Sequence, residues 1–530
     1  MKKGKIIWKI VSRILLLIVF FILIIVLKSA NWFLRNFNEV DFSIAMYQLF
    51  SPLKGTEAGV LDDYINKCLY PSFFFSILCV IAYSIYDMMS GRLFLKLDVR
   101  IRTRNICLKG RQRRYPHMRK MIILWGVIAV LCVCVWNRAV AVGIPEYVES
   151  ITHVSNIFET EYVSPDAISI TFPEKKRNLI VIYMESMETT YASTLDGGGK
   201  AVNYIPELTQ LARENVFFSN DDDLGGAGGA AETGWTMGGL FAGSTGVPYK
   251  LPIDGNNAGE YESFAPGLKG LGEILKENGY NNYFMCGSDA TFGGRRAFYE
   301  QHGNYEVLDH GTARKSGFIP EDYHVHWGME DEKLYEYAKQ ELTDIAQREE
   351  PFGFVMLTAD THPANGYICG LCDNVYPNQY ENVLACASRQ LSQFIDWVKE
   401  QDWYENTTIV ITGDHLNMKV DFWDDIGDYQ RKIYNCFINI PVGLEASRTT
   451  NREFSILDMF PTILTSIGAD IEGDRLGLGT NLFSQQQTLP EQMGFEGFNK
   501  ELKLYSNYYY VNFIIGNSIQ EITTELADNP

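Results

Sequence analysis

Cysteine is scarce in this chain: ten residues in 530 are too few for a fold held together by disulfides. The sequence also lacks internal repeats and low-complexity segments, which excludes a repeat architecture. Basic residues are few after residue 120, where 26 Lys and Arg stand against 58 Asp and Glu. An acidic body of this kind argues against a nucleic-acid partner.

The basic residues are concentrated at the start of the chain. Residues 1–120 carry 20 Lys and Arg against 7 Asp and Glu, a net charge of +13, whereas the remainder carries a net −32. A basic start joined to an acidic body fits a membrane anchor followed by a soluble domain. At 530 residues the chain is long enough for a large core and a second region.

One cysteine pair has a spacing that suggests chemistry, Cys369–Gly370–Leu371–Cys372. A redox motif would need a thioredoxin-like strand–helix context, which the neighbouring sequence does not show. A zinc knuckle would need a second pair, and Cys386 alone does not supply one. If the domain is extracellular, a local disulfide involving Cys369, Cys372 or Cys386 is an alternative. The pairing among these three cysteines stays open.

Three apolar segments predict membrane-spanning helices, at about residues 10–29, 68–86 and 121–137, each near the roughly 20 residues that a span needs. The first segment follows several basic residues and resembles a signal peptide. Because Lys28–Ser29–Ala30 is a poor cleavage site and further spans follow, a retained anchor is favoured. The loop from Arg92 to Lys120 is strongly basic, so the positive-inside rule places it in the cytoplasm. Everything after about residue 140 is then expected outside the cytoplasm.

We therefore expect a transmembrane region at 1–140, a linker at 141–175, an extracytoplasmic domain at 176–490 and a C-terminal extension at 491–530. Within the large domain, apolar runs and helical periodicities alternate. This alternation predicts an α/β fold with a mostly parallel sheet flanked by helices. The predicted strands are 178–184, 216–219, 282–286, 352–358, 407–412 and 433–441, and the predicted helices are 206–215, 271–278, 331–347, 382–400 and 455–468.

Two of the predicted strands end in residues that can bind a ligand. The strand at 178–184 is followed by Glu185, and the strand at 407–412 is followed by Asp414 and His415. A Glu at the end of a buried strand is more commonly a cap or an ion-pair partner than a metal ligand. The carboxyl ends of strands in open α/β sheets are, however, where ligands and metals collect. Two such ends would present Glu, Asp and His to one cleft.

A glycine-rich segment, residues 225–231, lies between these strands and leads to Thr233 just before a predicted helix. A threonine there is by default an N-cap. The start of a helix also favours an anion such as phosphate, and a hydroxyl that coordinates a divalent metal becomes a nucleophile. The residues alone leave cap and nucleophile as equal alternatives.

Five motifs together carry a resemblance to a known family: Ile182–Tyr183–Met184–Glu185–Ser186, Glu232–Thr233–Gly234–Trp235–Thr236, Leu357–Thr358–Ala359–Asp360–Thr361–His362, Thr412–Gly413–Asp414–His415 and Leu457–Asp458–Met459–Phe460–Pro461–Thr462. Residues from about 178 to 470 resemble the alkaline-phosphatase/sulfatase superfamily. More closely they resemble the membrane-anchored phosphoglycerol transferases, which include lipoteichoic acid synthases and enzymes that decorate periplasmic glucans. The first four motifs come in the family's order and spacing. The resemblance implies an alkaline-phosphatase/sulfatase-like sheet.

The resemblance also implies a metal site made of Glu185, Thr233, Asp414 and His415. In the family the ion is usually Mn²⁺, with Zn²⁺ or Mg²⁺ in related enzymes, and this ligand set is compatible with Mn²⁺ without excluding Zn²⁺. Thr233 would be the catalytic nucleophile that accepts the phosphoglycerol group.

Two further residues match family positions that hold the phosphoglycerol, His362 and Arg295. His362 would also donate a proton to a leaving hydroxyl; a loop histidine hydrogen-bonded to its surroundings is the alternative. Arg296 is adjacent to Arg295, and either can form a bidentate phosphate clamp.

The chain departs from the family in several places. Lipoteichoic acid synthases carry a histidine where this chain has Cys286, so the acceptor-side pocket is expected to differ. Five spans are common in those enzymes, against three expected here. No Cys/Ser-x-Pro-x-Arg sequence occurs, so a strict sulfatase has no candidate nucleophile. The stretch from Phe37 to Gly55 resembles, more weakly, an extracellular loop of the glucan-type enzymes.

The function implied by the resemblance is metal-dependent transfer of sn-glycerol-phosphate from phosphatidylglycerol, through a phosphothreonine-type intermediate. The acceptor would be an extracytoplasmic glycan, glycolipid or polyglycerolphosphate chain, and the enzyme would sit in a bacterial plasma membrane as a multi-pass protein. A phosphoethanolamine transferase or phosphodiesterase on the same scaffold is one alternative. A catalytically inactive membrane sensor is another. The acceptor, the metal, the oligomeric state and any proteolytic release of the domain stay open.

Overall fold

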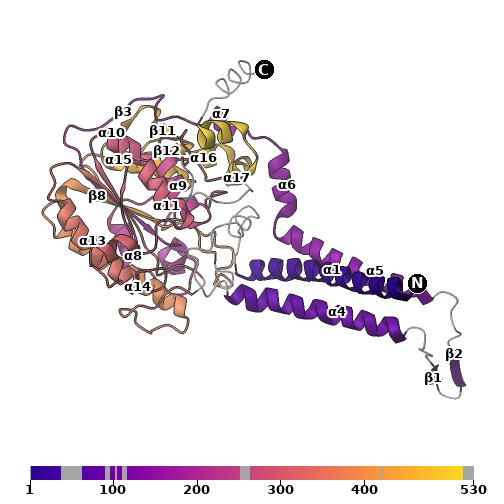
Figure 1. Cartoon of the computed structure of the whole chain (residues 1–530). Helices are drawn as coiled ribbons and strands as arrows, with labels where there is room; N and C mark the ends of the chain where they lie inside the picture. Colours follow the sequence, from indigo (N-terminus) through magenta and orange to yellow (C-terminus); the bar gives the residue numbers. More distant parts are fainter. Residues whose placement is uncertain are drawn as a thin grey trace. The chain divides into compact units, whose positions relative to one another are not determined.

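The computed structural model describes residues 2–36, 62–89, 96–101, 104–109, 116–250, 263–363, 365–418 and 422–516 (Figure 1). These residues form two compact units, with the boundary at Pro145 and Glu146. The weak loop resemblance between Phe37 and Gly55 lies outside the described residues.

The first unit contains three helices that are long and apolar enough to cross a membrane, over Ile6–Asn36, Asp62–Asp87 and Met121–Ala141. They correspond to α1 (Lys2–Asn36), to a short π-helix that leads into α4 (Tyr70–Met89), and to α5 (Pro116–Ala141). Their passage across a membrane and its orientation stay predictions. The basic loop holds an antiparallel hairpin that the sequence analysis did not predict, β1 (Lys96–Ile101) and β2 (Arg104–Lys109).

Few side chains are buried among the described parts of these helices. Phe20 and Ile24 of α1 pack with Leu124 of α5, and Arg13 forms an ion pair with Asp87 at 2.8 Å. Large apolar side chains elsewhere on the helices are exposed. An apolar surface of this extent needs a partner other than water, and lipid supplies one.

The second unit is built on a six-stranded sheet with the order β6-β5-β7-β4-β8-β9. All neighbouring strands are parallel except β8 and β9. The prediction of a mostly parallel α/β sheet is therefore confirmed. Its strands are β4 (Asn178–Met184), β5 (Asn281–Cys286), β6 (Glu306–Leu308), β7 (Phe352–Leu357), β8 (Thr407–Gly413) and β9 (Asn435–Ile438).

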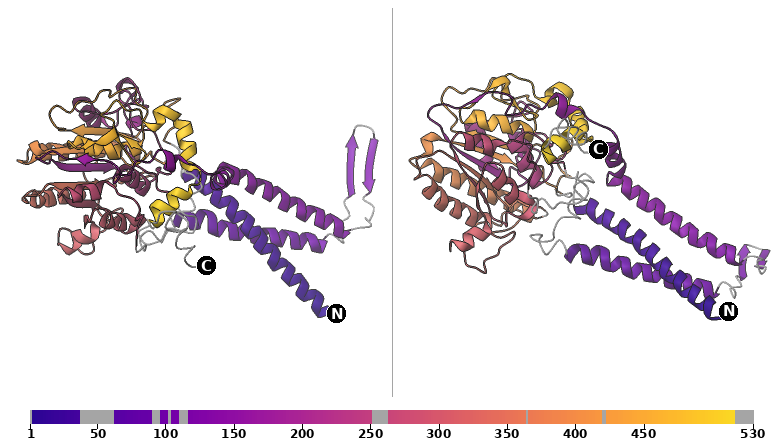
Figure 2. Two further views of the ribbon diagram at one scale, coloured as in Figure 1. Left: turned by 90° about the horizontal axis from the view of Figure 1, so that it is seen from above. Right: turned by 45° about the horizontal axis from the view of Figure 1, so that its top comes forward.

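Both faces of the sheet are covered by helices, as Figures 1 and 2 show. Successive residues of β4 alternate between two separate cores, which explains why the strand is an unbroken apolar run. One face packs against α9 (Thr236–Thr245), α10 (Leu271–Glu277) and α15 (Met459–Ser466). The other face packs against α8 (Pro206–Glu214), α13 (Asp331–Ile345) and α14 (Gln379–Lys399).

The short strand predicted at 216–219 is wrong. Val216 forms an isolated bridge with Phe437, and the backbone then turns to other partners. The amide of Phe218 donates to the side chain of Asn435, and that of Ser219 donates to the carbonyl of Thr449. The segment is extended but does not continue a ladder.

The residues after 490 pack into the same core as the sheet. Phe498, Leu502, Tyr509 and Phe513 are buried there, and the ammonium of Lys250 donates to the carbonyl of Leu502 at 2.8 Å. The domain boundaries inferred from the sequence stay a prediction.

The remaining elements are α6 (Ile144–Thr152), α7 (Ile157–Thr160), α11 (Arg295–Gln301), α12 (His310–Lys315), α16 (Leu489–Met493), α17 (Phe495–Lys503), β3 (Ile170–Thr171), β10 (Asp470–Ile471), β11 (Arg475–Leu476) and β12 (Gly479–Thr480).

Candidate active site at the carboxyl end of the sheet

Glu185, Asp414 and His415 converge at the carboxyl ends of β4 and β8. Because these strands are adjacent and parallel, the residues that follow them emerge at one edge of the sheet. One ligand atom from each of the three side chains lies within 4.8 Å of the others, and all three are buried. His415 Nε2 is 3.3 Å from Glu185 Oε1 and 3.4 Å from Asp414 Oδ2.

The unsatisfied atoms of this cluster fit a divalent cation. Among the described residues, Asp414 Oδ2 and His415 Nε2 are buried without a hydrogen-bond partner. The second oxygen of Asp414 accepts the amides of Ser186 at 2.8 Å and His415 at 2.9 Å. His415 Nδ1 lies 2.8 Å from the carbonyl of Leu416, which requires the proton on Nδ1 and leaves the Nε2 lone pair for a metal. Two carboxylates and one imidazole are a common donor set for Mn²⁺ and Zn²⁺.

The pKa shifts of these three side chains follow from the negative charge that the cluster concentrates. Burial, reinforced by the charge of Glu185, raises the pKa of Asp414 to about 7. Burial alone would lower the pKa of His415, but Asp414 and Glu185 outweigh it and raise that pKa to about 9. Burial would raise the pKa of Glu185, but His415 and then His362 outweigh it and lower that pKa below its usual range. The cluster is therefore suited to hold a positive charge.

Backbone strain marks two positions of the candidate site. Ser186 and Glu232 are non-glycine residues with φ of 51° and 62°, in the left-handed region. They directly follow Glu185 and directly precede Thr233. Ser186 Oγ donates to Glu185 Oε1 at 2.7 Å, so the strained residue also orients the carboxylate. Strain of this kind concentrates at functional sites.

Thr233 is not a helix cap. Helix α9 begins at Thr236 with Trp235 as its N-cap, so the cap interpretation is wrong. Thr233 is buried, and its hydroxyl donates to the carbonyl of Ala230 at 2.8 Å. Its role as nucleophile and metal ligand stays a prediction.

The start of α9 lies against the cluster of Glu185, Asp414 and His415. Thr236 Oγ1 donates to Glu185 Oε2 at 3.0 Å. One turn further, a Cβ at Gly239 would lie 2.1 Å from the carbonyl oxygen of Asp414, so only glycine permits this approach. Of the two threonines, Thr236 rather than Thr233 has a hydrogen bond to the cluster in the described part of the chain. Thr236 belongs to the Glu232–Thr236 motif, but the sequence assigned it no role.

His362 approaches the cluster from the end of β7. The hydroxyl of Thr361 donates to the carbonyl of Glu185, and Thr358 Oγ1 accepts the Glu185 amide at 3.1 Å. His362 Nδ1 lies 2.7 Å from the carbonyl of Pro363, and its ring centroid is 4.8 Å from that of Trp327. Nothing in the sequence identified Trp327, because its ring contact with His362 joins two segments that are 35 residues apart in the chain.

The structure distinguishes Arg295 from Arg296. Arg296 forms ion pairs with Glu300 at 2.9 Å and Asp309 at 2.6 Å. Arg295 is buried, has no ion pair among the described residues, and donates to Ser288 Oγ and to the carbonyls of Phe292 and Asp289, at 3.0–3.1 Å. Arg295 is therefore the arginine whose charge is not offset by a carboxylate, although no direct contact joins it to the metal-ligand cluster in the described structure.

Cys286, the departure from the family noted above, lies buried at the end of β5 and donates through Sγ to the carbonyl of Ser288 at 3.4 Å. The side chain of Ser288 in turn accepts from Arg295. Cys286 thus belongs to the surroundings of Arg295, where it places a small and weakly polar group.

The fold and this cluster define an α/β protein with a buried Glu–Asp–His cluster, at the carboxyl edge of its central sheet, that fits a divalent metal. The comparison with known families agrees: residues 177–469, more than half of the chain, match the family described as "Sulfatase". The chain belongs to the sulfatase family.

Individual relatives carry more specific names than the family description. The chain is 30% identical over 335 residues to phosphoglycerol transferase I of Escherichia coli (strain 55989 / EAEC) and of Shigella flexneri, which covers 62% of this chain and 41% of each relative. It thus spans about two fifths of those proteins. Among solved structures, the lipoteichoic acid synthase LtaP from Listeria monocytogenes aligns with a TM-score of 0.46 and 18% identity, over 62% of this chain and 80% of that one. The phosphoethanolamine transferase EptA from Neisseria meningitidis aligns with a TM-score of 0.46 and 13% identity, over 87% and 84%.

Proposed function

We propose that this chain is a metal-dependent phosphoglycerol transferase. It takes sn-glycerol-phosphate from phosphatidylglycerol and passes it to an extracytoplasmic glycan, glycolipid or polyglycerolphosphate chain. The observation that carries the proposal is the buried cluster of Glu185, Asp414 and His415, which has two unsatisfied ligand atoms and accepts a hydrogen bond from Thr236 at the start of α9. The 30% identity to phosphoglycerol transferase I supports phosphatidylglycerol as the donor class.

The metal site would consist of Glu185, Asp414 and His415, with Thr233 as a further ligand and Mn²⁺ as the proposed ion. A divalent cation held there makes a coordinated hydroxyl easier to deprotonate and offsets negative charge on the phosphoryl oxygens. Thr233 must first give up its present hydrogen bond to Ala230. Loss of that single bond is a small cost, about 1 kcal/mol.

The Thr233 hydroxyl would release its proton to solvent when the metal binds. In the first step, the resulting alkoxide attacks phosphorus and the bond from phosphorus to the diacylglycerol oxygen breaks. Protonated His362 gives its Nε2 proton to the departing oxygen, since Nδ1 is held by the Pro363 carbonyl. In the second step, an acceptor hydroxyl attacks the phosphothreonine and passes its proton to His362 Nε2. Thr233 leaves as the alkoxide, and both residues return to their starting states.

The apolar helices of the first unit support a membrane location for this chemistry. Three helices could anchor the chain in a bacterial plasma membrane, and the basic loop between the second and third would stay in the cytoplasm. The sulfatase domain would then act outside the cytoplasm. The scissile bond of a phospholipid lies at headgroup level, which an anchored domain can reach.

The donor assignment is tested with the full chain in liposomes that contain acyl-labelled phosphatidylglycerol or acyl-labelled phosphatidylethanolamine, with Mn²⁺ present. We expect labelled diacylglycerol from phosphatidylglycerol, at a rate about tenfold or more above that from phosphatidylethanolamine. The Thr233→Ala variant serves as the negative control for diacylglycerol release. Release from phosphatidylethanolamine alone would replace the proposal with phosphoethanolamine transfer, and release from neither lipid would refute both.

Arg295→Lys and Arg296→Lys form a matched pair that tests the phosphate clamp. Arg295→Lys keeps the charge but loses the planar fork, so kcat/KM should fall by about 10- to 100-fold, as expected for a lost charge-assisted hydrogen bond. Arg296→Lys should stay within about twofold, because its carboxylate partners accept an ammonium. Steady-state kinetics on phosphatidylglycerol would measure both. Equal losses in the two variants would contradict the assignment of Arg295.

A further inference from the structure

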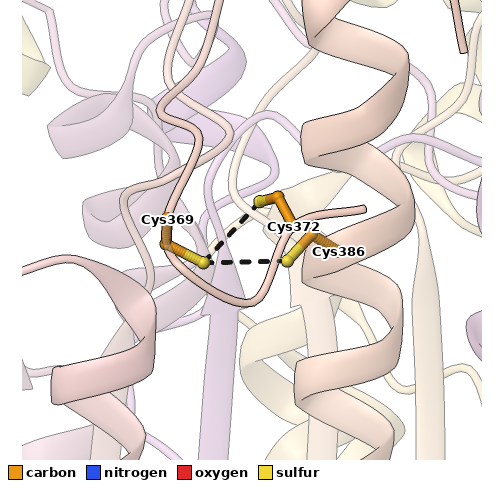
Figure 3. Close-up of side chains that lie close together, drawn as sticks. All are labelled: Cys369, Cys372 and Cys386. Carbon is orange, nitrogen blue, oxygen red and sulfur yellow. Dashed lines mark hydrogen bonds between the residues drawn. The ribbon is translucent and has the colours of Figure 1, made fainter. Parts of the chain in front are cut away.

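Three cysteines that are separated in the sequence form one cluster in the second unit. Cys369 and Cys372 lie in the loop that follows His362, and Cys386 lies on α14, as Figure 3 shows. Cys369 Sγ is 3.6 Å from Cys372 Sγ and 3.7 Å from Cys386 Sγ. All three are free thiols, and their sulfur atoms lie within 4.8 Å of one another.

The spacing of the sulfur atoms matches a tetrahedral metal centre. Zinc–thiolate bonds are about 2.3 Å long, so two sulfur ligands of one tetrahedral ion lie about 3.8 Å apart. The two shortest distances here, 3.6 and 3.7 Å, are close to that value. A pairwise disulfide would use two of the sulfur atoms and leave the third beside it, whereas a metal ion uses all three.

Gln390 lies one helical turn after Cys386 and faces the same point. Its Nε2 is 3.3 Å from Cys386 Sγ and 3.6 Å from Cys369 Sγ, and Gln390 is buried. Its Oε1 is buried without a hydrogen-bond partner in the described structure. Rotating the amide by half a turn exchanges the two atoms and directs the unpartnered oxygen at the sulfur atoms, where it can serve as a fourth ligand. In the present orientation the amide nitrogen instead donates to the sulfur atoms of Cys386 and Cys369.

The surroundings of the thiols are acidic. A Cβ at Gly370, inside the Cys369–Cys372 turn, would lie 3.8 Å from Glu332 Oε2. This carboxylate would favour a cation held by the nearby sulfur atoms.

We propose that Cys369, Cys372 and Cys386 bind a thiophilic divalent cation of the Zn²⁺ type, at a structural site separate from the Glu185 cluster. On binding, each thiol releases its proton to solvent and its sulfur coordinates as a thiolate, with no change of oxidation state. The fourth position is taken by Gln390 or by water. Metal-bound thiolates are also protected from oxidation outside the cytoplasm, where free thiols would form disulfides.

The metal would clamp the loop that carries His362. This loop runs from the end of β7 to the start of α14, and its described internal contacts include the Tyr367 amide donating to the Asp360 carbonyl at 2.7 Å. Binding of Cys369, Cys372 and Cys386 to one metal ion would attach the part of the loop that contains Cys369 and Cys372 to α14, which packs on the sheet. His362 would then be held from both sides, by Thr361 on the strand side and by the cluster on the helix side.

The test uses the full chain purified in detergent without chelators or reductants, loaded with Co²⁺. Thiolate coordination gives an intense near-ultraviolet charge-transfer absorption, which the oxygen and nitrogen ligands of the Glu185 cluster cannot produce. We expect this band in the parent and in Cys132→Ser, an exposed cysteine outside the cluster, and its loss in Cys372→Ser. Elemental analysis of the purified protein before cobalt is added should show one zinc fewer per chain in Cys372→Ser than in the parent.

Alkylation of the parent protein followed by mass spectrometry tests the same proposal without a variant. We expect Cys369, Cys372 and Cys386 to resist alkylation until a chelator is added, and then to react together. A disulfide between any two of them, or three reactive thiols with no cobalt band, would overturn the metal site. None of these measurements depends on transferase activity, so failure here and failure of the proposed function are distinguishable.

Discussion

Thr233→Ala is expected to abolish transfer, with a loss of about 10³-fold or more in kcat, because it removes the atom that forms the covalent bond. Incubation of the full chain with phosphatidylglycerol and Mn²⁺, without an acceptor, should add one phosphoglycerol group to the parent. Thr233→Ala should show no added mass. Intact-mass measurement, with peptide mapping to locate the group, checks both statements.

Two controls separate chemistry from folding in this experiment. Thr233→Ser keeps the hydroxyl and should still form the adduct, at a rate within about tenfold of the parent. Thr236→Val removes the hydroxyl that donates to Glu185 but leaves Thr233 in place, so the adduct should form more slowly without disappearing. An adduct located on Thr236, or an adduct that persists in Thr233→Ala, would show that the nucleophile has been wrongly assigned.

Removal of the metal is expected to have an effect of similar size. Chelation should stop diacylglycerol release, and Mn²⁺ should restore it. His415→Ala removes one of three buried ligands, so metal affinity at this site should fall by more than the roughly 10- to 100-fold that loss of a supporting contact costs. Calorimetric titration with Mn²⁺ measures that change, with the exposed His153→Ala as the matched control.

Metal bound at the proposed cysteine site must not contribute to this measurement. In a Cys372→Ser background, the Glu185 cluster is the one remaining candidate centre found among the described His, Cys, Asp and Glu groups. His415→Ala in that background should bind almost no metal. If it binds Mn²⁺ as tightly as the Cys372→Ser parent, the cluster is not the metal centre and the proposed mechanism loses its basis.

The apolar run at 178–184 was sufficient to predict the central strand, and a second such run at 407–412 was needed to predict a site at their ends. A strand that is apolar on both faces must lie inside a sheet covered by helices, and β4 does. The residues after such a strand emerge at the sheet edge whatever the details of register. Two strands of this kind ending in ligand residues therefore predicted the neighbourhood of Glu185, Asp414 and His415 before their distances were known.

Weaker local patterns failed where the backbone had competing partners. The segment at 216–219 has strand-like composition, but the Asn435 side chain and the Thr449 carbonyl take its amides. Thr233 resembled a cap because a helix follows it, yet the helix begins three residues later. Local sequence does not reveal which hydrogen-bond partners a folded chain brings within reach.

By itself, the sequence determined the fold class, the apolar helices and the strand-end cluster, because hydrophobic periodicity and strand polarity act locally and repeat along the chain. Only the tertiary structure decided which of two adjacent arginines has no carboxylate partner, that Thr236 is bonded to Glu185, and that Cys386 joins Cys369 and Cys372. Each of these facts depends on a side-chain contact between separate elements or loops of the fold. The physical reason is that contacts across the sheet and its helices are set by side-chain packing in three dimensions, which no local pattern encodes.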